Sequence, residues 1–368
     1  MKLSLMAVVL LTVVSAHAAL YRVSTNGGES WADADSLSAA ITAATTDNSI
    51  IELMADDDTF VTAETKIEHS VVLRSSTENG NLKPFTIRKS VAAGCLRPNK
   101  AGKTVAVTNI VFDGNAKWSN ANIIYLDQES GGVGQGKMFY LVAGELHLGA
   151  GAVITNLYGE AVSSSAKNAI VLRFGEGAKI VDCRAAKAPQ INLSYNGANK
   201  ASLYMTGGII TNCYNNNDSR SLYNIGIVGF YGVSHSGSMN ITGGEISGNK
   251  VYYSDGGGAL YATGPVRFSG SPRIYGNAVR VNDLESNVNI PDSQNLILDG
   301  ELGDSAFISV AFANPVLGAT FGVAEGAYRG AKHFLPDNYF GKPKLNGEVD
   351  DGKLVWGRVA SGLMLILR

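Results

Sequence analysis

The sequence predicts an all-β fold: a right-handed, single-stranded parallel β-helix whose short strands stack coil upon coil. The 368-residue chain holds 43 Gly and only 17% charged residues, whereas typical globular proteins have about 7% Gly and about 25% charged residues. Short runs rich in Val, Ile and Thr alternate with Gly- and Asn-containing turns from residue 50 onward, a pattern typical of strands. A similar segment also recurs about every 30 residues from residue 140 onward.

Each copy of this recurring segment is centred on an isoleucine. The five central residues are Ile154, Ile180, Ile210, Ile246 and Ile274. A single unit cannot bury its apolar face, so stacked units must share one core. Repeat lengths that vary are explained if the extra residues bulge outward at a turn. A leucine-rich repeat has a shorter period of about 20–29 residues and a Leu/Asn consensus. Other all-β folds remain the alternative to the β-helix.

The ends of the chain differ from the repeats. Asp35 or Ser36 can cap a short amphipathic helix at 36–44, and Ile50 to Met54 reads as the next strand. The last coil needs a cover because open sheet ends invite association; a small sorting module is the other interpretation of the tail. We therefore expect an N-terminal cap at 19–50, the β-helix at 51–300 and a C-terminal β cap at 301–368.

Residues 1–18 have the layout of a secretory signal peptide. Lys2 precedes the apolar run Leu3 to Val14, and Ala16-His17-Ala18 provides a cleavage site. Removing this segment changes the net charge from −2 to −3, because Lys2 leaves with it (29 − 32). We expect a secreted, extracellular or cell-surface protein, cleaved near Ala18. The remaining chain has no apolar run of the ~20 residues needed to span a membrane.

Charge and cysteine content exclude several classes of protein. With 30 Lys+Arg against 32 Asp+Glu, the chain lacks the basic excess of nucleic-acid-binding proteins. Three Cys cannot supply a disulfide framework, and without a CxxC motif or His cluster we expect no metal site and no cofactor. Cys183 and Cys213 should occupy the same site in adjacent coils. We favour stacked, reduced thiols there, with a disulfide as the alternative.

Asparagine recurs after the central isoleucine. Asn156, Asn212, Asn249 and Asn277 occur there, with Asp182 in the corresponding place. Asn tolerates the left-handed conformation that tight turns need, and stacked Asn side chains can pair along a solenoid. A structural role is therefore favoured over a polar stripe that binds ions or ligands.

The repeats resemble those of a known family. Thr206 to Asn212, its copy Thr242 to Asn249, and Gly257-Gly258-Ala259-Leu260-Tyr261 are similar to coils of polymorphic outer membrane proteins and other secreted bacterial, pectate-lyase-like surface proteins. The helix at Leu37 to Ala44, followed by a strand, resembles the N-terminal cap of such chains. The resemblance implies a parallel β-helix at a cell surface; it says little about function.

Aromatic residues concentrate in the later coils and suggest a binding surface. The residues involved are Tyr214, Tyr223, Phe230, Tyr231, Tyr252, Tyr253, Tyr261 and Tyr275. Tyr offers amphipathic contact area at low entropic cost, although such rings can equally pack inside the coils. As candidate ligand-binding residues we select Tyr231, Tyr252, Tyr253, Asp255 and Tyr261. The sequence thus predicts a non-enzymatic, adhesin-like protein that binds a glycan or a protein; its oligomeric state is left open.

The alternative function is a carbohydrate-active enzyme, because the β-helix fold carries polysaccharide lyases and glycoside hydrolases. The Gly-His-Gly and Arg-x-Lys motifs of polygalacturonases and the Trp-x-Asp-His motif of pectate lyases are absent. Acidic residues are sparse in the central coils: Asp182, Asp218, Glu245 and Asp255. Hydrolysis needs two facing carboxylates, so the sequence favours a binding protein over an enzyme.

Overall fold

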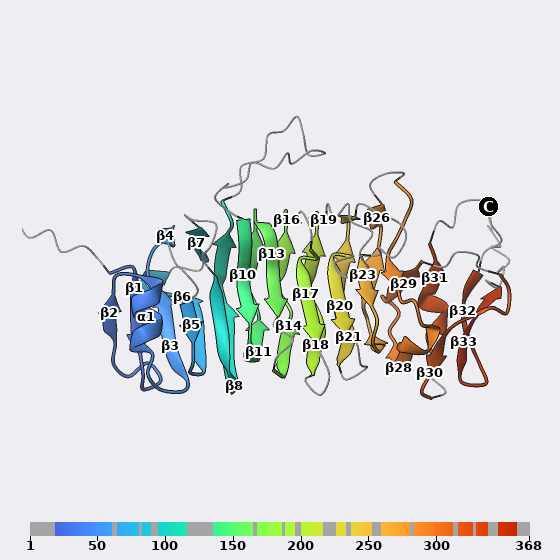
Figure 1. Ribbon diagram of the computed structural model, residues 1–368, viewed down its shortest axis with the longest axis horizontal. Helices are drawn as coiled ribbons and strands as arrows, with labels where there is room; N and C mark the ends of the chain where they lie inside the picture. The colour runs from blue at the N-terminus through green and yellow to red at the C-terminus, as the bar shows by residue number, and fades with distance from the viewer. Residues whose placement is uncertain are drawn as a thin grey trace, which may run out of the picture.

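The computed structural model describes most of the chain as β-strands that follow one another along a single long axis (Figure 1). The described residues are 19–60, 65–80, 83–89, 95–115, 135–164, 168–185, 188–195, 200–215, 226–232, 237–251, 259–279, 283–311, 316–326, 329–337 and 345–358. The predicted signal peptide at 1–18 lies outside them.

Most strand pairs are parallel, and each strand pairs with one from the next repeat. The first ladder of paired strands comprises β3 (Ser49–Leu53), β6 (Val71–Ser75), β8 (Leu96–Thr108), β11 (Ala143–Leu148), β14 (Ile170–Phe174), β18 (Ala201–Thr211), β21 (Ser238–Ser247), β24 (Val266–Gly270), β28 (Leu296–Leu302) and β30 (Thr320–Ala324). The fold class is therefore all-β with a large, mostly parallel sheet, as the sequence predicts.

A second ladder runs beside the first and includes the predicted isoleucines. It comprises β4 (Asp57–Phe60), β7 (Phe85–Lys89), β9 (Ile110–Asp113), β12 (Ala152–Thr155), β15 (Lys179–Val181), the ends of β18 and β21, β25 (Arg273–Tyr275), β29 (Phe307–Val310) and β31 (Phe334–Pro336). The five isoleucines pair in unbroken succession, which confirms the repeat.

A third ladder completes each repeat. It comprises β5 (Thr65–Ile67), the start of β8, β10 (Gln135–Leu141), β13 (Tyr158–Ser164), β17 (Ile191–Tyr195), β20 (Val228–Gly232), β23 (Leu260–Ala262), β27 (Val288–Asn289) and the end of β29. Four short strands form a further ladder beginning at β13: β16 (Arg184–Ala185), β19 (Tyr214–Asn215), β22 (Lys250–Val251) and β26 (Ala278–Val279).

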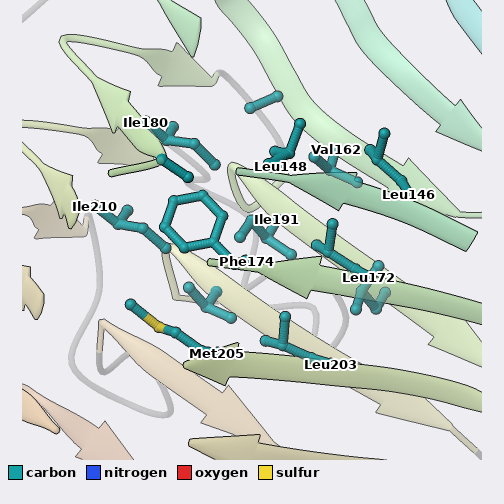
Figure 2. Packing of buried hydrophobic residues seen from close by; sticks show 14 of the residues in the cluster. Leu146, Leu148, Val162, Leu172, Phe174, Ile180, Ile191, Leu203, Met205 and Ile210 are labelled. Atoms are coloured by element: carbon teal, nitrogen blue, oxygen red, sulfur yellow. The ribbon is translucent and has the colours of Figure 1, made fainter. Parts of the chain in front are cut away.

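The inward-facing side chains of the three ladders form one continuous apolar core. Leu172 and Phe174 of the first ladder meet Ile180 of the second and Ile191 of the third (Figure 2). These four side chains are fully buried. Because strand residues alternate between faces, each repeat adds apolar side chains to the core, and a fully buried Leu or Phe contributes about 1.5–3 kcal/mol.

Antiparallel pairs occur at the two ends of the stack. At the N-terminal end, β1 (Tyr21–Ser24) pairs with β2 (Ala32–Ala34) and with β3. At the C-terminal end, β33 (Lys353–Arg358) pairs with β30 and with β32 (Leu345–Asp350). The predicted boundary at residue 300 falls within β28, and parallel pairing continues beyond it to β31. Among the described residues, three short 3-10 helices lie between the strands: η1 (Glu78–Gly80), η2 (Ser293–Asn295) and η3 (Ala331–His333).

The predicted helix is present as α1 (Leu37–Ala43). Ser36 is the N-cap, its hydroxyl accepting a hydrogen bond from the Ala39 amide at 3.2 Å. Leu37, Ala40 and Ile41 are buried, so the apolar stripe faces the protein as its spacing predicts.

The recurring asparagines do not all occupy the same turn position, which corrects the prediction that they do. Left-handed backbone occurs at Asn156, Asp182 and Asn212, but in the next two repeats Gly248 and Gly276 hold that position, as their φ angles of 64° and 62° show. Asn249 and Asn277, which we expected at the same turn position, therefore lie one residue later. Glycine is the residue best suited to the left-handed turn, which leaves these two asparagines free to point inward.

Cys183 and Cys213 occupy the inward position that Asn249 and Asn277 hold in the later repeats. Their strands are in register through Ile180 and Ile210. Both thiols are fully buried and are not joined in a disulfide, in agreement with stacked, reduced cysteines. Burial, together with the adjacent Cys183 thiol, raises the pKa of Cys213, which makes this thiol a weak nucleophile.

Candidate ligand-binding face

The structure describes little of the predicted aromatic site. Tyr252, Tyr253 and Asp255 lie outside the described residues, and Tyr231 lies in β20 with a side chain that is not described. Tyr261 lies in β23, where all three residues are buried, and its side chain is only 3% exposed. The Tyr261 ring therefore faces protein rather than solvent.

An aromatic pair of one exposed and one partly buried ring lies instead on the outer side of the second ladder. The rings of Tyr275, in β25, and Phe307, in β29, have centroids 5.7 Å apart and meet edge to face at 79°. Phe307 is 39% exposed, which is unusual for a residue of its size in this protein. The two residues come together because β25 and β29 are neighbours in the ladder, with Arg273 opposite Phe307.

Polar groups surround this pair on the same face. The Glu245 carboxylate accepts hydrogen bonds from the Tyr275 hydroxyl at 3.0 Å and from the Ser247 hydroxyl at 2.6 Å. The Arg273 guanidinium lies 5.1 Å from the Tyr275 ring centroid, and its Nε lies 3.6 Å from a Glu245 oxygen. We call Glu245, Ser247, Arg273, Tyr275 and Phe307 the Tyr275 cluster.

Electrostatic interactions link Arg273 to its neighbours in the cluster. Its interaction with Tyr275, followed by the negative charge of Glu245, raises the pKa of Arg273 above its usual value, against the opposing effect of burial. Arg273 therefore stays cationic beside an acceptor and an aromatic surface. Tyr275 and Glu245 are separate candidates in the sequence, and no sequence pattern pairs them with Phe307. The signal that could have linked Glu245 to Arg273 was their common position, one residue before the central isoleucines Ile246 and Ile274.

A second polar row crosses the outer side of the first ladder. Its members occupy one register position in successive strands: His147, Arg173, Tyr204, Asn240 and Arg267. Glu145 contacts His147 at 2.8 Å and Arg173 at 3.3 Å, and the hydrogen bond from His147 is the main cause of the lowered pKa of Glu145. The Arg173 guanidinium stacks 4.7 Å from the Tyr204 ring centroid.

Carboxylates on these faces are paired with arginines of the neighbouring strand. The pairs are Glu52 with Arg74, Asp113 with Arg88, Glu145 with Arg173, Glu245 with Arg273, and Asp299 with Arg267. Pairing of opposite charges across strands stabilises a sheet. Charge compensation between repeats accounts for these acids without assigning them acid–base chemistry.

The described residues were also compared with the requirements of a metal site and of a membrane-spanning helix. Across the described ranges, no group of three or more His, Cys, Asp or Glu side chains is arranged to hold a metal ion. Within the same part of the chain, no helix has the length and apolar character of a membrane span.

Comparison of the chain with protein-family models, curated proteins and solved structures gives no match. The functional assignment therefore depends on the residues and geometry of this chain.

Proposed function

We propose that the three ladders form a right-handed parallel β-helix of the pectate-lyase-like type, and that the protein is exported to act as a non-enzymatic, adhesin-like glycan-binding protein. The parallel pairing of successive repeats supports the architecture. The N-terminal segment supports export. Ligand contacts would come from side chains on the outer faces of the ladders, since the inner faces form the core.

The observation that carries this proposal is the Tyr275 cluster. The exposed Phe307 ring, beside the partly buried Tyr275 ring, offers an apolar surface for the C–H face of a sugar ring. The adjacent carboxylate can accept hydrogen bonds from the hydroxyl groups of the sugar, and the guanidinium can donate hydrogen bonds to them. A stable protein interface buries about 800 Å² per partner. A cluster of five side chains on one outer face is better matched to one or two sugar rings than to a protein.

Substitution of the aromatic pair tests the proposal. The mature chain beginning at residue 19 is screened on a glycan array, and the best ligand is titrated against Tyr275→Ala and Phe307→Ala by calorimetry. We expect each change to weaken binding about tenfold or more, because one aromatic contact of this type is worth roughly 0.5–1.5 kcal/mol beyond its buried area. Leu317→Ala is the matched control, since Leu317 is 54% exposed elsewhere on the molecule.

The outcomes separate the competing assignments. Binding that survives both aromatic substitutions but is lost in Tyr252→Ala/Tyr253→Ala places the site in the coil first selected from the sequence. If the mature chain binds a protein and no glycan, the ligand is a protein and the glycan assignment is wrong. Release of reducing sugars or unsaturated products from polysaccharides, with or without calcium, makes the protein an enzyme and overturns the proposal.

A further inference from the structure

The outer side of the first ladder carries an incompletely compensated cation near its N-terminal end. The Arg74 guanidinium, in β6, lies 2.6 Å from Glu52 and its side chain is 42% exposed. The buried Glu52 carboxylate is shared with Arg22, whose guanidinium also contacts Glu78. One buried carboxylate therefore serves two arginines, which leaves the exposed side of Arg74 able to bind a second anion.

An incompletely compensated anion lies near the opposite end of the same face. Glu325 directly follows β30, and its side chain is 44% exposed. Arg267 Nη2 donates to Glu325 Oε1 at 2.9 Å, and the same guanidinium lies 3.3 Å from Asp299. Two carboxylates therefore share one arginine, which is the reverse of the arrangement at Arg74.

Arg74 and Glu325 occupy the same register position on this face. Each directly follows an inward residue, and these inward residues pair in unbroken succession from Leu73 of β6 to Ala324 of β30. The strand β18, which carries Tyr204, lies four strands from β6 and four strands from β30. A twofold axis along β18 therefore places Arg74 of one copy opposite Glu325 of a second copy.

The same axis places complementary groups opposite one another in the middle of the face. Arg173 of β14 and Asn240 of β21 flank Tyr204 at one register position, so each Arg173 lies opposite Asn240 of the other copy. The Asn240 Nδ2 donates to the Ser238 hydroxyl at 3.2 Å, and its Oδ1 can accept from the opposing guanidinium. Tyr204 lies on the axis and meets its own counterpart.

The remaining charges of the face are also matched. The strands β11 and β24 lie two strands from β18 on either side. The hydrogen-bonded Glu145–His147 pair of one copy therefore lies opposite Arg267 of the other, and the carboxylate can approach the opposing guanidinium.

The size of the face suits a dimer. It extends over nine strands, from β6 to β30. At a spacing of about 4.8 Å, with about five residues per strand rising about 3.3 Å each, these strands cover roughly 700 Å². A stable interface buries about 800 Å² per partner, so the face is large enough to hold a second copy of the chain.

We propose that a second copy of this chain binds to the outer side of the first ladder, with the two stacks antiparallel and related by a twofold axis through Tyr204. Each contact across such an interface occurs twice. Charge complementarity selects the antiparallel orientation, because a parallel one would place Arg74 opposite Arg74 and Glu325 opposite Glu325. The dimer is independent of the proposed glycan binding, since the Tyr275 cluster lies on the second ladder.

Sedimentation equilibrium of the mature chain tests the dimer. We expect the average mass to rise with concentration to twice that of the monomer and then to stay constant, because a closed twofold interface admits only two copies. Added salt should weaken the association, since the contacts between exposed charges are screened. A chain that stays monomeric at every concentration overturns the proposal.

A charge swap tests the contact between Arg74 and Glu325. Arg74→Glu and Glu325→Arg should each weaken the dimer about tenfold, because like charges then face each other at two places, and the double variant should restore it. Within one chain the two residues are eight strand spacings apart, roughly 38 Å, which exceeds the screening length of about 10 Å. Restoration can therefore arise only between copies. A double variant that dimerises no better than the single variants overturns the antiparallel arrangement.

Tyr204→Glu tests the position of the axis and decides the matter if Arg74→Glu, beside the buried Glu52, fails to fold. The new carboxylate can pair with Arg173 of its own chain but faces its own counterpart across the axis, so the dimer should weaken at least tenfold (an order-of-magnitude expectation). Lys179→Glu, at an exposed position of the second ladder, is the matched control and should leave the dimer unchanged. A dimer that tolerates Tyr204→Glu as well as it tolerates Lys179→Glu refutes the proposal.

Discussion

At the scale of single residues, one backbone position in each repeat selects its amino acid by conformation. Asn156, Asp182, Asn212, Gly248 and Gly276 share the left-handed conformation, at φ angles of 50° to 64°. Only glycine and short polar residues adopt it readily. The residue that follows points inward, and there the chain changes from cysteine to asparagine along the stack, so that Asn249 donates a hydrogen bond to Asn277.

Lys89 illustrates the cost of a buried charge. It ends β7 with a fully buried side chain whose Nζ donates to the Lys137 carbonyl at 3.3 Å, and burial lowers its pKa to about 8. We expect Lys89→Met to raise the free energy of unfolding at pH 7 by about 1–3 kcal/mol, because it removes a desolvated ammonium.

The gain should shrink between pH 8 and about pH 10.4, since over this interval the folded chain has lost the proton that the unfolded chain keeps. Urea denaturation at pH 7 and pH 10 measures the effect. Lys179→Met, at an exposed position of β15, serves as control and should change little. A Lys89→Met chain less stable than the parent at pH 7 contradicts this interpretation.

At the scale of elements, α1 depends on local signals that are visible in the sequence. The Ser36 cap satisfies one of the first backbone amides of a helix only seven residues long, and helices this short do not persist without caps or tertiary packing. Packing of Leu37 and Ile41 against the first strands also stabilises the helix.

Removal of the cap should destabilise the N-terminal end. Ser36→Ala is expected to cost about 1 kcal/mol, measured by urea unfolding with Trp31 as the fluorescent probe in a Trp118→Phe/Trp356→Phe background. Ser38→Ala is the matched control within the helix; it should be neutral or slightly stabilising, because Ala has the higher helix propensity. Equal losses in both variants would show that the cap contributes nothing.

At the scale of the whole molecule, the stack must end without exposing a strand edge. The β32–β33 hairpin closes the C-terminal end through antiparallel pairing of β33 with β30. Parallel ladders otherwise present unpaired backbone groups at the last strand, and such edges promote association between chains.

Deletion of residues 345–368 should therefore cause self-association. We expect the truncated chain to show a concentration-dependent increase in mass relative to the full chain, measured by size-exclusion chromatography with light scattering. Deletion of residues 359–368 alone retains the hairpin and should leave the mass distribution unchanged. A truncated chain that remains folded with the mass distribution of the full chain would show that the hairpin does not protect the edge.

The sequence by itself determined the elements whose causes are local. The spacing of Leu37, Ala40 and Ile41 defined α1, and the recurrence of the central isoleucines gave the parallel register of the second ladder. Alternation of apolar residues also identified much of the core, because a strand presents every second side chain to the same face. Each of these patterns either lies within one helix or strand or recurs at the same place in successive repeats.

The tertiary structure decided which side chains from different repeats meet. Tyr275 and Phe307 become neighbours, and Asn287 meets Asp337, only because turns of unequal length bring their strands into register. Tyr261, selected from the sequence for its aromatic ring, is buried because β23 is covered on both faces. The meeting of particular side chains on an outer face, and the covering of that face, depend on contacts between distant segments, and composition and periodicity do not encode those contacts.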